Sequence, residues 1–331
     1  MEVKYSVVIP VFNRPIEVKE LLESLCAQTY KEFEVIIVED GSEITSIDVF
    51  NDFRSKLNIQ YFFKLNSGPG LSRNYGAEKA HGQFIVFFDS DCLIPEHYFE
   101  SLNEELKKEE FDAYGGPDMA HSSFTNIQKS ISYAMTSFLT TGGIRGGKRK
   151  LDKFHPRSFN MGFTQKVFKE TQGFSKMRFG EDIDMSLRIF AMGFRVRFIE
   201  TSFVFHKRRT DFRKFFKQIF NSGMARINLY LNHPKSLSLV HFLPAAFVCG
   251  AIFLCLMSLI FWWAFLPLVF YSLLLFMDAL VQTKNLKVSV LCIFASFVQL
   301  FAYGLGFLNA IWKMLILKKK GKFAFENNFY K

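Results

Sequence analysis

Two aspartates one residue apart, Asp89 and Asp91, directly follow the apolar run Phe84–Phe88. In an extended chain the side chains of residues i and i+2 point to the same face, so both carboxylates can face one site at the end of a strand. Two such charges repel each other unless a cation lies between them, and carboxylate pairs suit Mg²⁺ or Mn²⁺, which also bind substrate phosphates. Aspartate is also a common turn residue, so the pair alone indicates a metal site only weakly.

Polar residues follow the other apolar runs of the first half in the same way. The first run ends in "PVFNRP" and the second in "VEDGS", where Asp40 can accept hydrogen bonds from a base or a ribose and Gly41 permits the turn. The third is followed by "NSGPGLSRNYG", in which Arg73 offers a fork suited to a phosphate or a pyrimidine edge. Each stretch alone is more simply an ordinary loop, and only the set favours a binding site.

The elements that must position these residues alternate between strand and helix patterns. The expected strands are 5–12, 33–39, 59–64 and 83–88, and the expected helices are 17–28, one before 59, and 71–81, the last ended by Gly82. This alternation predicts an α/β fold with a mainly parallel sheet flanked by helices. Such sheets bind ligands beyond the carboxyl ends of their strands, which is where the polar residues lie.

The pattern loosens between Pro117 and His206. The stretch 140–150 carries four glycines and four basic residues, which is typical of a loop. A short strand near 159–164 and a helix over 181–192 are expected after it. The five cysteines show neither metal-ligand spacing nor a disulfide framework, and the first apolar run is too short for a signal peptide. We therefore expect the sheet domain to stay in the cytoplasm.

The last third of the chain has the composition of membrane segments. None of the 42 residues between Lys235 and Asp278 is Asp, Glu, Lys or Arg, and one span needs about 20. Two spans, 238–261 and 264–283, with a turn near Trp262 and Trp263, and a third over 288–312 are expected. Basic segments, 203–237 and 313–331, contribute +7 and +5 to the net charge of +10 and bracket this region. That placement favours a membrane over nucleic acid as partner.

The pattern leaves the topology of this region open. Three crossings would place "LKKKGK" on the side opposite a cytoplasmic domain, against the positive-inside tendency, unless the third segment is re-entrant. Ahead of the first span, residues 211–236 contain basic and aromatic residues at helical spacing. This segment fits an amphipathic helix at the membrane interface, or a helix packed on the soluble domain. The expected organisation is thus a domain over 1–210, this linker, a membrane region over 237–316 and a basic tail over 317–331.

The motifs "VVIPVFN", "VEDGS", "GPGLSRN", "FFDSD" and "FGEDIDMSLR" occur in one order over Val3–His206. In this set the chain resembles the inverting family 2 glycosyltransferases with the GT-A fold. The resemblance implies a Rossmann-like GT-A sheet, a nucleotide-sugar donor, usually a UDP-sugar, and a divalent cation, Mn²⁺ or Mg²⁺.

The resemblance also assigns residues. The donor-binding set is Pro10, Asn13, Glu39, Asp40, Arg73 and Asp89, with Glu39 standing where the family often has an aspartate. Asp91 is the expected direct metal ligand, with Asp89 beside it and His206 as a third ligand, although a lone histidine is as often structural. The segment around Asn160 resembles the acceptor side. Arg145 and Lys148 could meet an acceptor's pyrophosphate or simply form a solvated basic loop.

Inversion requires a carboxylate that takes the proton of the acceptor hydroxyl. The resemblance assigns this role to Asp182, with Glu181 as its neighbour, in "GEDIDMSLR". Both stand at the expected start of a helix, whose dipole favours an ionised carboxylate. Helix capping is the alternative role for one of them.

We therefore expect a metal-dependent glycosyltransferase at the cytoplasmic face of the inner membrane, adding a sugar to a lipid-linked or polysaccharide acceptor. The three tryptophans, Trp262, Trp263 and Trp312, lie in the apolar region. None is available for the Q-x-x-R-W motif of the processive synthases, so one sugar per event is expected. The alternatives are a nucleotidyltransferase-like enzyme, disfavoured because "PVFNRP" lacks a glycine, and a non-catalytic membrane scaffold that keeps the fold.

Overall fold

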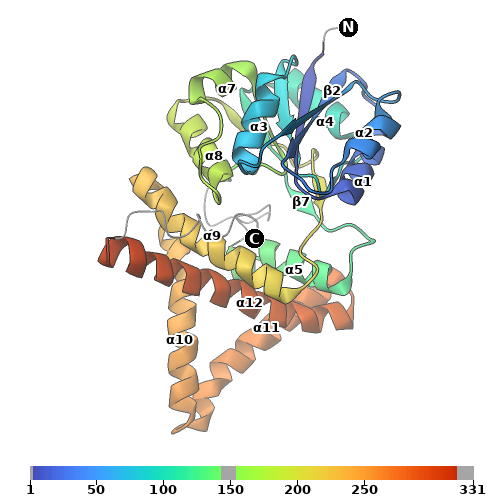
Figure 1. Ribbon diagram of the computed structural model, residues 1–331. Helices are drawn as coiled ribbons and strands as arrows, with labels where there is room; N and C mark the ends of the chain where they lie inside the picture. Colours follow the sequence, from blue (N-terminus) through green and yellow to red (C-terminus); the bar gives the residue numbers. More distant parts are fainter. Residues whose placement is uncertain (1–2, 143–153, 319–331) are drawn as a thin grey trace. The chain divides into compact units, whose positions relative to one another are not determined.

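The computed structural model describes residues 3–142 and 154–318 (Figure 1). The chain divides into two compact units. We call the first, Met1–His121 with His155–Lys207, the sheet unit, and the second, Ser122–Phe154 with Arg208–Lys331, the helical unit. The chain therefore crosses between the units more than once, whereas the sequence suggested one continuous domain over 1–210.

The sheet unit contains a seven-stranded sheet with the order β3-β2-β1-β4-β8-β6-β9. Its strands are β1 (Tyr5–Val11), β2 (Phe33–Asp40), β3 (Ile59–Lys64), β4 (Phe84–Phe87), β6 (Ala113–Gly115), β8 (Met161–Thr164) and β9 (Val196–Phe198). The first four are parallel, and β8 runs antiparallel to both β4 and β6. The mainly parallel α/β sheet predicted from the sequence is confirmed.

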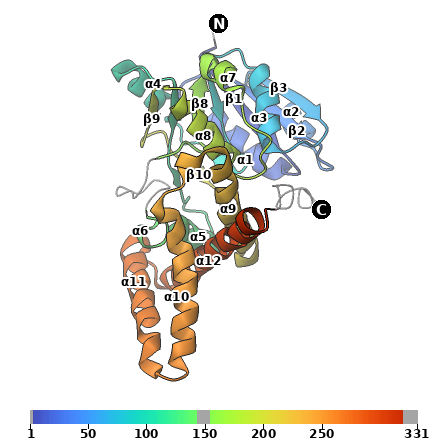
Figure 2. The same cartoon turned by 90° about the vertical axis from the view of Figure 1, so that its left-hand side faces the viewer.

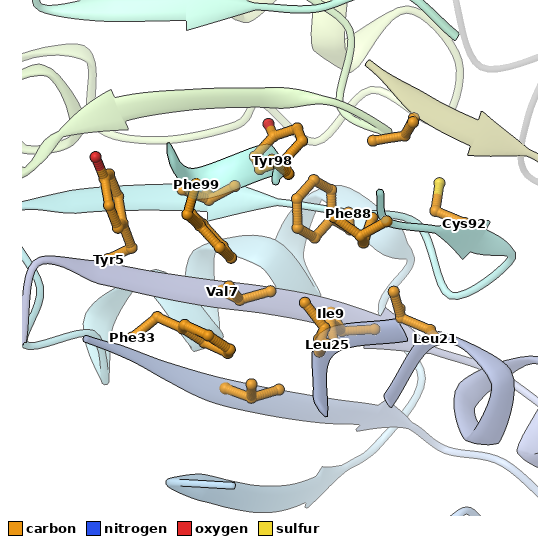
Figure 3. Packing of buried hydrophobic residues seen from close by; sticks show 14 of the residues in the cluster. Tyr5, Val7, Ile9, Leu21, Leu25, Phe33, Phe88, Cys92, Tyr98 and Phe99 are labelled. Atoms are coloured by element: carbon orange, nitrogen blue, oxygen red, sulfur yellow. The ribbon is translucent and has the colours of Figure 1, made fainter. Parts of the chain in front are cut away.

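Helices cover both faces of this sheet (Figure 1). They are α1 (Pro15–Cys26), α2 (Ile47–Phe53), α3 (Pro69–Glu78), α4 (Tyr98–Lys108), α7 (Gln165–Thr171) and α8 (Glu181–Ala191). Alternate residues of β1 face the two sides of the sheet. Val7 and Ile9 pack with α1 and α4 (Figure 3), whereas Val8 packs with α3 and α8. Burial on both faces is why the parallel strands are continuous apolar runs rather than alternating ones.

A small second sheet lies in the same unit, with the order β5-β10-β7. It consists of β5 (Cys92–Leu93), β10 (Val204–His206) and β7 (Asp118–Met119). His206 pairs with Cys92, which directly follows Asp91. A strand of two or three residues has no periodicity, so the sequence does not predict that this sheet joins His206 to the end of β4.

The helical unit comprises α5 (Asn126–Thr136), α6 (Phe138–Thr141), α9 (Phe212–Asn232), α10 (Leu243–Ser258), α11 (Leu266–Thr283) and α12 (Leu286–Ala310). Short 3-10 turns occupy Pro234–Ser236, Leu239–Phe242 and Trp262–Phe265, and a π-helical turn, Ile311–Ile316, follows α12. Helix α5 belongs here because Ile131 and Met135 pack with Phe215 of α9 and Ala295 of α12. The sequence placed α5 inside the first domain. It could not place α5 in the helical unit, because the residues that α5 contacts there lie far along the chain.

Three helical segments of the described residues are long and apolar enough to cross a membrane. They are Leu239–Ser258, Trp262–Thr283 and Leu286–Ile316, of 20, 22 and 31 residues. The first two are 17% buried within the protein and the third is 50% buried. The three expected apolar segments are thus present as helices, and the third differs from the others in its surroundings.

Candidate active site

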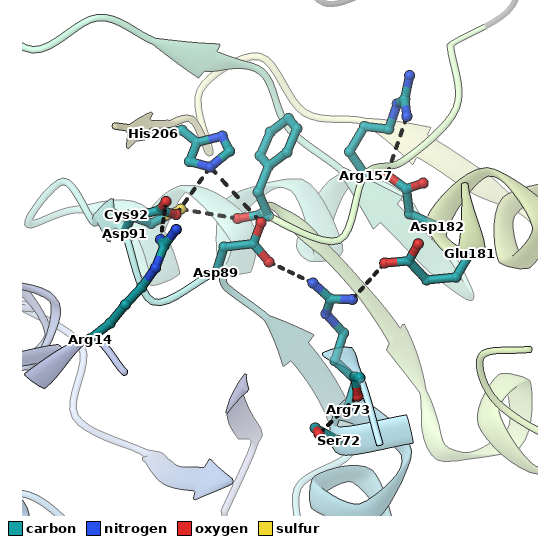
Figure 4. Close-up of polar contacts among 12 residues, drawn as sticks. Arg14, Ser72, Arg73, Asp89, Asp91, Cys92, Arg157, Glu181, Asp182 and His206 are labelled. Carbon is teal, nitrogen blue, oxygen red and sulfur yellow. Dashed lines mark hydrogen bonds and ion pairs between the residues drawn. The ribbon is translucent and has the colours of Figure 1, made fainter. Parts of the chain in front are cut away.

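The polar residues that follow β1 and β4 meet side chains from α3, α8 and β10 (Figure 4). Parallel strands end at the same edge of a sheet, so the residues after them gather there although they are far apart in sequence.

The carboxylates of Asp89 and Asp91 converge on one imidazole. His206 Nε2 lies 3.1 Å from Asp91 Oδ1 and 3.9 Å from Asp89 Oδ2. The predicted convergence is present, but its local cause differs from the extended geometry expected. The chain turns at Ser90 and Asp91, and the Cys92 N–H donates to the Asp89 carbonyl at 3.1 Å. A turn, rather than a strand, aims the two side chains together.

Two arginines neutralise this pair. Arg14, from the segment after β1, donates to Asp91 Oδ2, and Arg73 of α3 donates to Asp89 Oδ1 at 2.6 Å. Burial by itself would raise the pKa of Asp91, but the charges of His206 and Arg14 outweigh it and hold that pKa well below its usual range. Asp91 is therefore ionised throughout the physiological pH range.

Arg73 also joins this pair to the acidic motif of α8. Its guanidinium is almost fully buried and donates from Nη1 to Glu181 Oε1 at 3.0 Å (Figure 4). It lies 5.5 Å from the ring centroid of Phe174. In this structure Arg73 thus links the two acidic ends of the site, and its expected contact with the donor stays a prediction.

Glu181 and Asp182 stand in the first turn of α8, yet their pKa values shift in opposite directions. Burial and the neighbouring charge of Asp182 raise the pKa of Glu181 to about 7. Burial opposes ionisation of Asp182 as well, but Arg157, whose Nη1 lies 3.2 Å from Asp182 Oδ2, lowers its pKa. Its Oδ1 also accepts from the Ile183 N–H at 2.8 Å. The two adjacent carboxylates thus titrate differently, and Glu181 binds a proton at a higher pH than Asp182 does.

His206 is oriented by its surroundings. Its ring stacks on Phe159 with centroids 4.9 Å apart, and its Nδ1 lies 3.8 Å from Asp118 Oδ2. A carboxylate near one ring nitrogen favours a tautomer that presents the other nitrogen to a metal. Here the other nitrogen, Nε2, is the atom that faces Asp89 and Asp91.

The donor set formed by these groups fits a divalent cation. Potential ligand atoms of Asp91, Cys92 and His206 lie within 4.8 Å of one another. Burial raises the pKa of the Cys92 thiol well above its ordinary value, so Cys92 stays protonated and is a poor ligand. Carboxylate oxygens with one imidazole remain, from Asp89, Asp91 and His206. This mixture suits Mn²⁺ better than Mg²⁺, because Mg²⁺ prefers oxygen ligands alone.

The loop after β2 is held by the other predicted donor residues. Asn13, at φ +52°, accepts on its Oδ1 from the N–H groups of Glu43 and Ile44, at 2.9 and 3.0 Å. Glu39 is fully buried and accepts from Ser42 Oγ and from the Ser46 N–H. Gly41 has φ +72°, the left-handed conformation for which the sequence indicated glycine. Asn13, from the segment after β1, and Glu39, from the end of β2, thus both hold this loop in place.

Asp40 fixes the loop that leads into α3. Its two carboxylate oxygens each accept a backbone N–H at 2.9 Å, from Ser67 and Gly68, and Lys64 donates to Oδ1. Pro10, near the end of β1, pairs in register with Val38 of β2. The predicted nucleoside-contact residues therefore lie on two adjacent strand ends.

The predicted acceptor-side residues have different outcomes. Asn160 is fully buried, and its amide joins Tyr98 Oη, the Pro117 carbonyl and the Ser202 carbonyl at 2.6, 3.2 and 2.8 Å. These contacts fit a structural role that ties together the segments before β7 and β10. Arg145 and Lys148 lie outside the described residues.

Four residues at the site had no predicted role: Arg14, Lys64, Asp118 and Arg157. Arg14 and Lys64 were within reach of sequence reasoning, since Arg14 stands in "PVFNRP" and Lys64 ends an expected strand. Asp118 and Arg157 carry no such signal. They reach His206 and Asp182 only because short irregular segments bring them there.

Comparison with known proteins identifies the family of the chain. The family model described as "Glycosyl transferase family 2" matches residues 6–172, about half of the chain. An uncharacterized glycosyltransferase of Rickettsia felis is 35% identical over 132 residues, which are 40% of this chain and 21% of that protein. The poly(ribitol-phosphate) beta-N-acetylglucosaminyltransferase TarS of Staphylococcus aureus is 39% identical over 95 residues, 28% of this chain and 17% of TarS. The matched stretch thus spans only about a fifth of these relatives.

Two solved structures show the same fold. Residues 1–349 of S. aureus TarS in complex with UDP-GlcNAc align with a TM-score of 0.53 and 18% identity, covering 93% of this chain and 91% of that one. The mannosyltransferase PcManGT of Pyrobaculum calidifontis, in complex with GDP-Man and Mn²⁺, aligns with a TM-score of 0.60 and 12% identity. It covers 95% of this chain and 88% of its own. At these identities the likeness concerns the fold.

Proposed function

The chain belongs to glycosyl transferase family 2, and on that basis we propose that it transfers one sugar, with inversion, from a UDP-sugar to a lipid-linked or polysaccharide acceptor. We propose further that the reaction depends on Mn²⁺ or Mg²⁺ and takes place at the cytoplasmic face of the inner membrane. One observation carries the proposal: Asp89, Asp91 and His206 meet beyond the end of β4, and Arg73 joins them to the acidic motif of α8.

The donor would lie over the ends of β1 and β2. In this proposal Pro10, Asn13 and the Glu39–Asp40 turn surround the nucleoside, and Arg73 contacts the base or the diphosphate. Asp89, Asp91 and His206 would hold the cation. A bound divalent cation supplies positive charge to the diphosphate as it departs, so that no general acid is needed.

Asp182 is the proposed general base. Arg157 lowers the pKa of Asp182, which keeps its carboxylate ionised and able to accept a proton from the acceptor hydroxyl. Glu181, whose pKa is raised to about 7, is the weaker candidate because Arg73 occupies its Oε1. It would hold Arg73 in place instead.

The kind of acceptor is inferred from the apolar helices of the helical unit. Its described residues include three helical segments long and apolar enough to cross a membrane, and a lipid-linked acceptor is confined to that surface. One relative supports a polymeric acceptor: TarS is named as a poly(ribitol-phosphate) beta-N-acetylglucosaminyltransferase. If washed membranes glycosylated a water-soluble acceptor as well as a lipid-linked one, this part of the proposal would fail.

The assigned roles are tested with two variants of the detergent-solubilised full chain. We expect Asp91→Ala to lose metal-dependent UDP binding, measured by calorimetry with and without Mn²⁺. We expect Asp182→Asn to bind UDP and Mn²⁺ like the wild type but to transfer sugar about 10²–10⁴-fold more slowly, the usual contribution of a general base. A panel of nucleotide-sugars, assayed for metal-dependent release of the nucleotide, identifies the donor. Equal loss of binding in both variants would contradict the roles.

A further inference from the structure

The third apolar helix, α12, differs from the hairpin of α10 and α11 in what surrounds it. By length and composition alone all three could cross a membrane. Half of the residues in the apolar stretch of α12 are buried within the protein, whereas 17% of those in the corresponding stretches of α10 and α11 are buried. The exposed side chains of the hairpin are large and apolar along its whole length, including Phe253, Leu256, Phe270 and Leu273. The three helices therefore share an apolar composition, but α12 is largely packed against protein whereas α10 and α11 are largely exposed.

Helix α12 lies beside α9 over most of its length. Phe212 of α9 contacts Phe294 with ring centroids 4.8 Å apart, and further along Asn309 Nδ2 lies 3.3 Å from Met224 Sδ. Between these ends the backbones approach closely, since a Cβ added to Gly306 would lie 2.1 Å from the Phe220 carbonyl oxygen. The two helices thus run in the same direction as a pair, and must share one depth in a membrane.

Helix α9 cannot lie in hydrocarbon. Its first turns carry Arg213, Lys214 and Lys217, all exposed to solvent. The spacing of its buried residues, Phe215, Ile219 and Gly223, gives it one apolar face, which is the face that meets α12. The opposite face, which carries these three charges, must stay in water or among the lipid headgroups. Since α12 lies alongside α9, a crossing by α12 would carry these charges into the bilayer.

The contacts of α12 with the hairpin also indicate that α12 does not cross the bilayer beside α10 and α11. Helix α10 meets α12 through Pro244 and Phe247, near the beginning of α10. Helix α11 meets α12 through Tyr271 and Leu275, around the middle of α11. The part of the hairpin around its tip has no such contact with α12 among the interactions of the described residues. Figures 1 and 2 both show α12 running across α10 and α11 rather than beside them as a third parallel helix.

The hairpin itself suits a bilayer from base to tip. Its two segments have 20 and 22 residues, about 30 Å of helix each, which equals the thickness of the hydrocarbon core. Lys235 and Lys284 stand at its two bases, and Asp278, near the second base, accepts from Tyr133 Oη of α5 at 2.6 Å. Asp278 is the only Asp, Glu, Lys or Arg in the sequence between these two lysines, so the rest of the hairpin carries no such charge.

The tip of the hairpin is apolar and carries no charge. Leu259, Ile260, Trp262 and Trp263 are all exposed. The backbone N–H groups of the turn are bonded within it, for example Phe261 to the Met257 carbonyl at 2.8 Å and Ala264 to the Phe261 carbonyl at 2.9 Å. Internal bonding of a turn is what a lipid environment requires. Tryptophans suit the far interface.

We infer that only the α10–α11 hairpin enters the hydrocarbon core of a bilayer, and that α12 lies in the membrane surface with α9. Both bases of the hairpin, α9 and the end of α12 with Lys313 and Lys318 then lie on one side. This agrees with the positive-inside rule, which a third crossing would break. The inference rests on the membrane association in the proposed function, but not on sugar transfer.

The three tryptophans of the chain provide the test, because the sheet unit has none. Variant Trp262→Phe/Trp263→Phe leaves Trp312 as the sole tryptophan, and variant Trp312→Phe leaves the two at the tip. Each full-length variant, with an N-terminal affinity tag, is reconstituted at less than one copy per vesicle into phosphatidylethanolamine–phosphatidylglycerol vesicles. Vesicles displaying the tag outward are captured, and iodide, which does not cross the bilayer, is added outside.

We expect iodide to quench Trp312 with a Stern–Volmer slope several times that of the tip variant, and both variants to be quenched in detergent. Quenching of neither in sealed vesicles would mean that α12 crosses, and quenching of both would mean that the hairpin does not insert; each result overturns the inference. A second measurement avoids reconstitution. Green fluorescent protein fused after Lys331 should fluoresce in bacterial cells, and alkaline phosphatase fused there should be inactive; the reverse overturns it.

Sugar transfer is assayed separately on the same tryptophan variants. If they transfer sugar normally but the iodide result is reversed, the topology is wrong and the proposed function stands. If the iodide result is as expected and no donor is consumed by the wild type, the function is wrong and the topology stands.

Discussion

At the scale of single residues, the site consists of four carboxylates, each bonded to an arginine. Arg14 neutralises Asp91, Arg73 is shared by Asp89 and Glu181, and Arg157 pairs with Asp182 (Figure 4). Truncating an arginine would leave a buried carboxylate without its partner, which costs far more than a surface pair contributes. The charge pattern therefore sets which carboxylate is ionised, and that in turn sets which one can act as a base.

Arg157 gives a pH prediction. It lowers the pKa of Asp182, and a base must be ionised to accept a proton. Replacing Arg157 by Gln should raise the pKa of Asp182, so the acid limb of the kcat–pH profile moves to higher pH. The matched control, Arg157→Lys, keeps the charge and should move the limb less. A profile that falls in height with no shift in pH would show that Arg157 acts on something other than this carboxylate.

At the scale of elements, close backbone approach decides the packing of the helical unit. Gly223 of α9 and Gly306 of α12 each face a carbonyl oxygen of the other helix, at 2.3 and 2.1 Å from the place of a Cβ. Glycine in a helix costs up to about 1 kcal/mol relative to alanine. Here that cost is offset by side-chain contacts such as those of Phe220 and Phe307, which need the helices close together.

The pair α9–α12 therefore predicts an asymmetry between two glycine variants. Gly306→Ala should destabilise the protein by about 1–3 kcal/mol, because the added methyl group has no room. Gly250→Ala, in α10 where nothing lies within 4 Å of the added methyl, should be neutral or slightly stabilising. Thermal unfolding of both variants in detergent measures the difference. Equal unfolding temperatures would mean that α9 and α12 do not pack as described.

At the scale of the whole molecule, two units are interleaved in sequence. Helix α5 belongs to the helical unit although residues on both sides of it, in β7 and β8, belong to the sheet unit. The binding residues proposed for the donor all lie in the sheet unit. Nucleotide binding and membrane packing should therefore respond to different substitutions, even where these are near each other in sequence.

Ile131 of α5 tests this division. It is fully buried against Phe215 and Ala295, so Ile131→Asp places an unpaired charge in the core of the helical unit. We expect the full chain to unfold at a lower temperature in detergent while its Kd for UDP and Mn²⁺ changes by less than about twofold, as for sites that share no contacts. Asn126→Asp, on the exposed part of the same helix, is the control and should change neither. Loss of nucleotide binding in Ile131→Asp alone would contradict the division.

The sequence by itself determined the elements that are uninterrupted apolar runs. The buried strands β1, β2 and β4 and the apolar helices α10 to α12 were all predicted from the length and the flanking residues of such runs. It also located Asp89 and Asp91, because polar residues that directly follow such runs lie at one edge of the sheet. Asp182 was assigned through the family resemblance. His206 was found through the family resemblance rather than through periodicity.

Only the tertiary structure decided the contacts made by short or irregular segments. β5, β7 and β10 have two or three residues each, too few for a pattern, yet they bring His206 and Asp118 to the aspartates. Arg157 reaches Asp182 from a segment without regular structure, and α5 joins the helical unit through residues more than eighty positions away. The depth of α12 was likewise beyond the sequence. Hydropathy measures only how apolar a segment is. Whether lipid or another helix covers its apolar face depends on packing between residues far apart in the sequence.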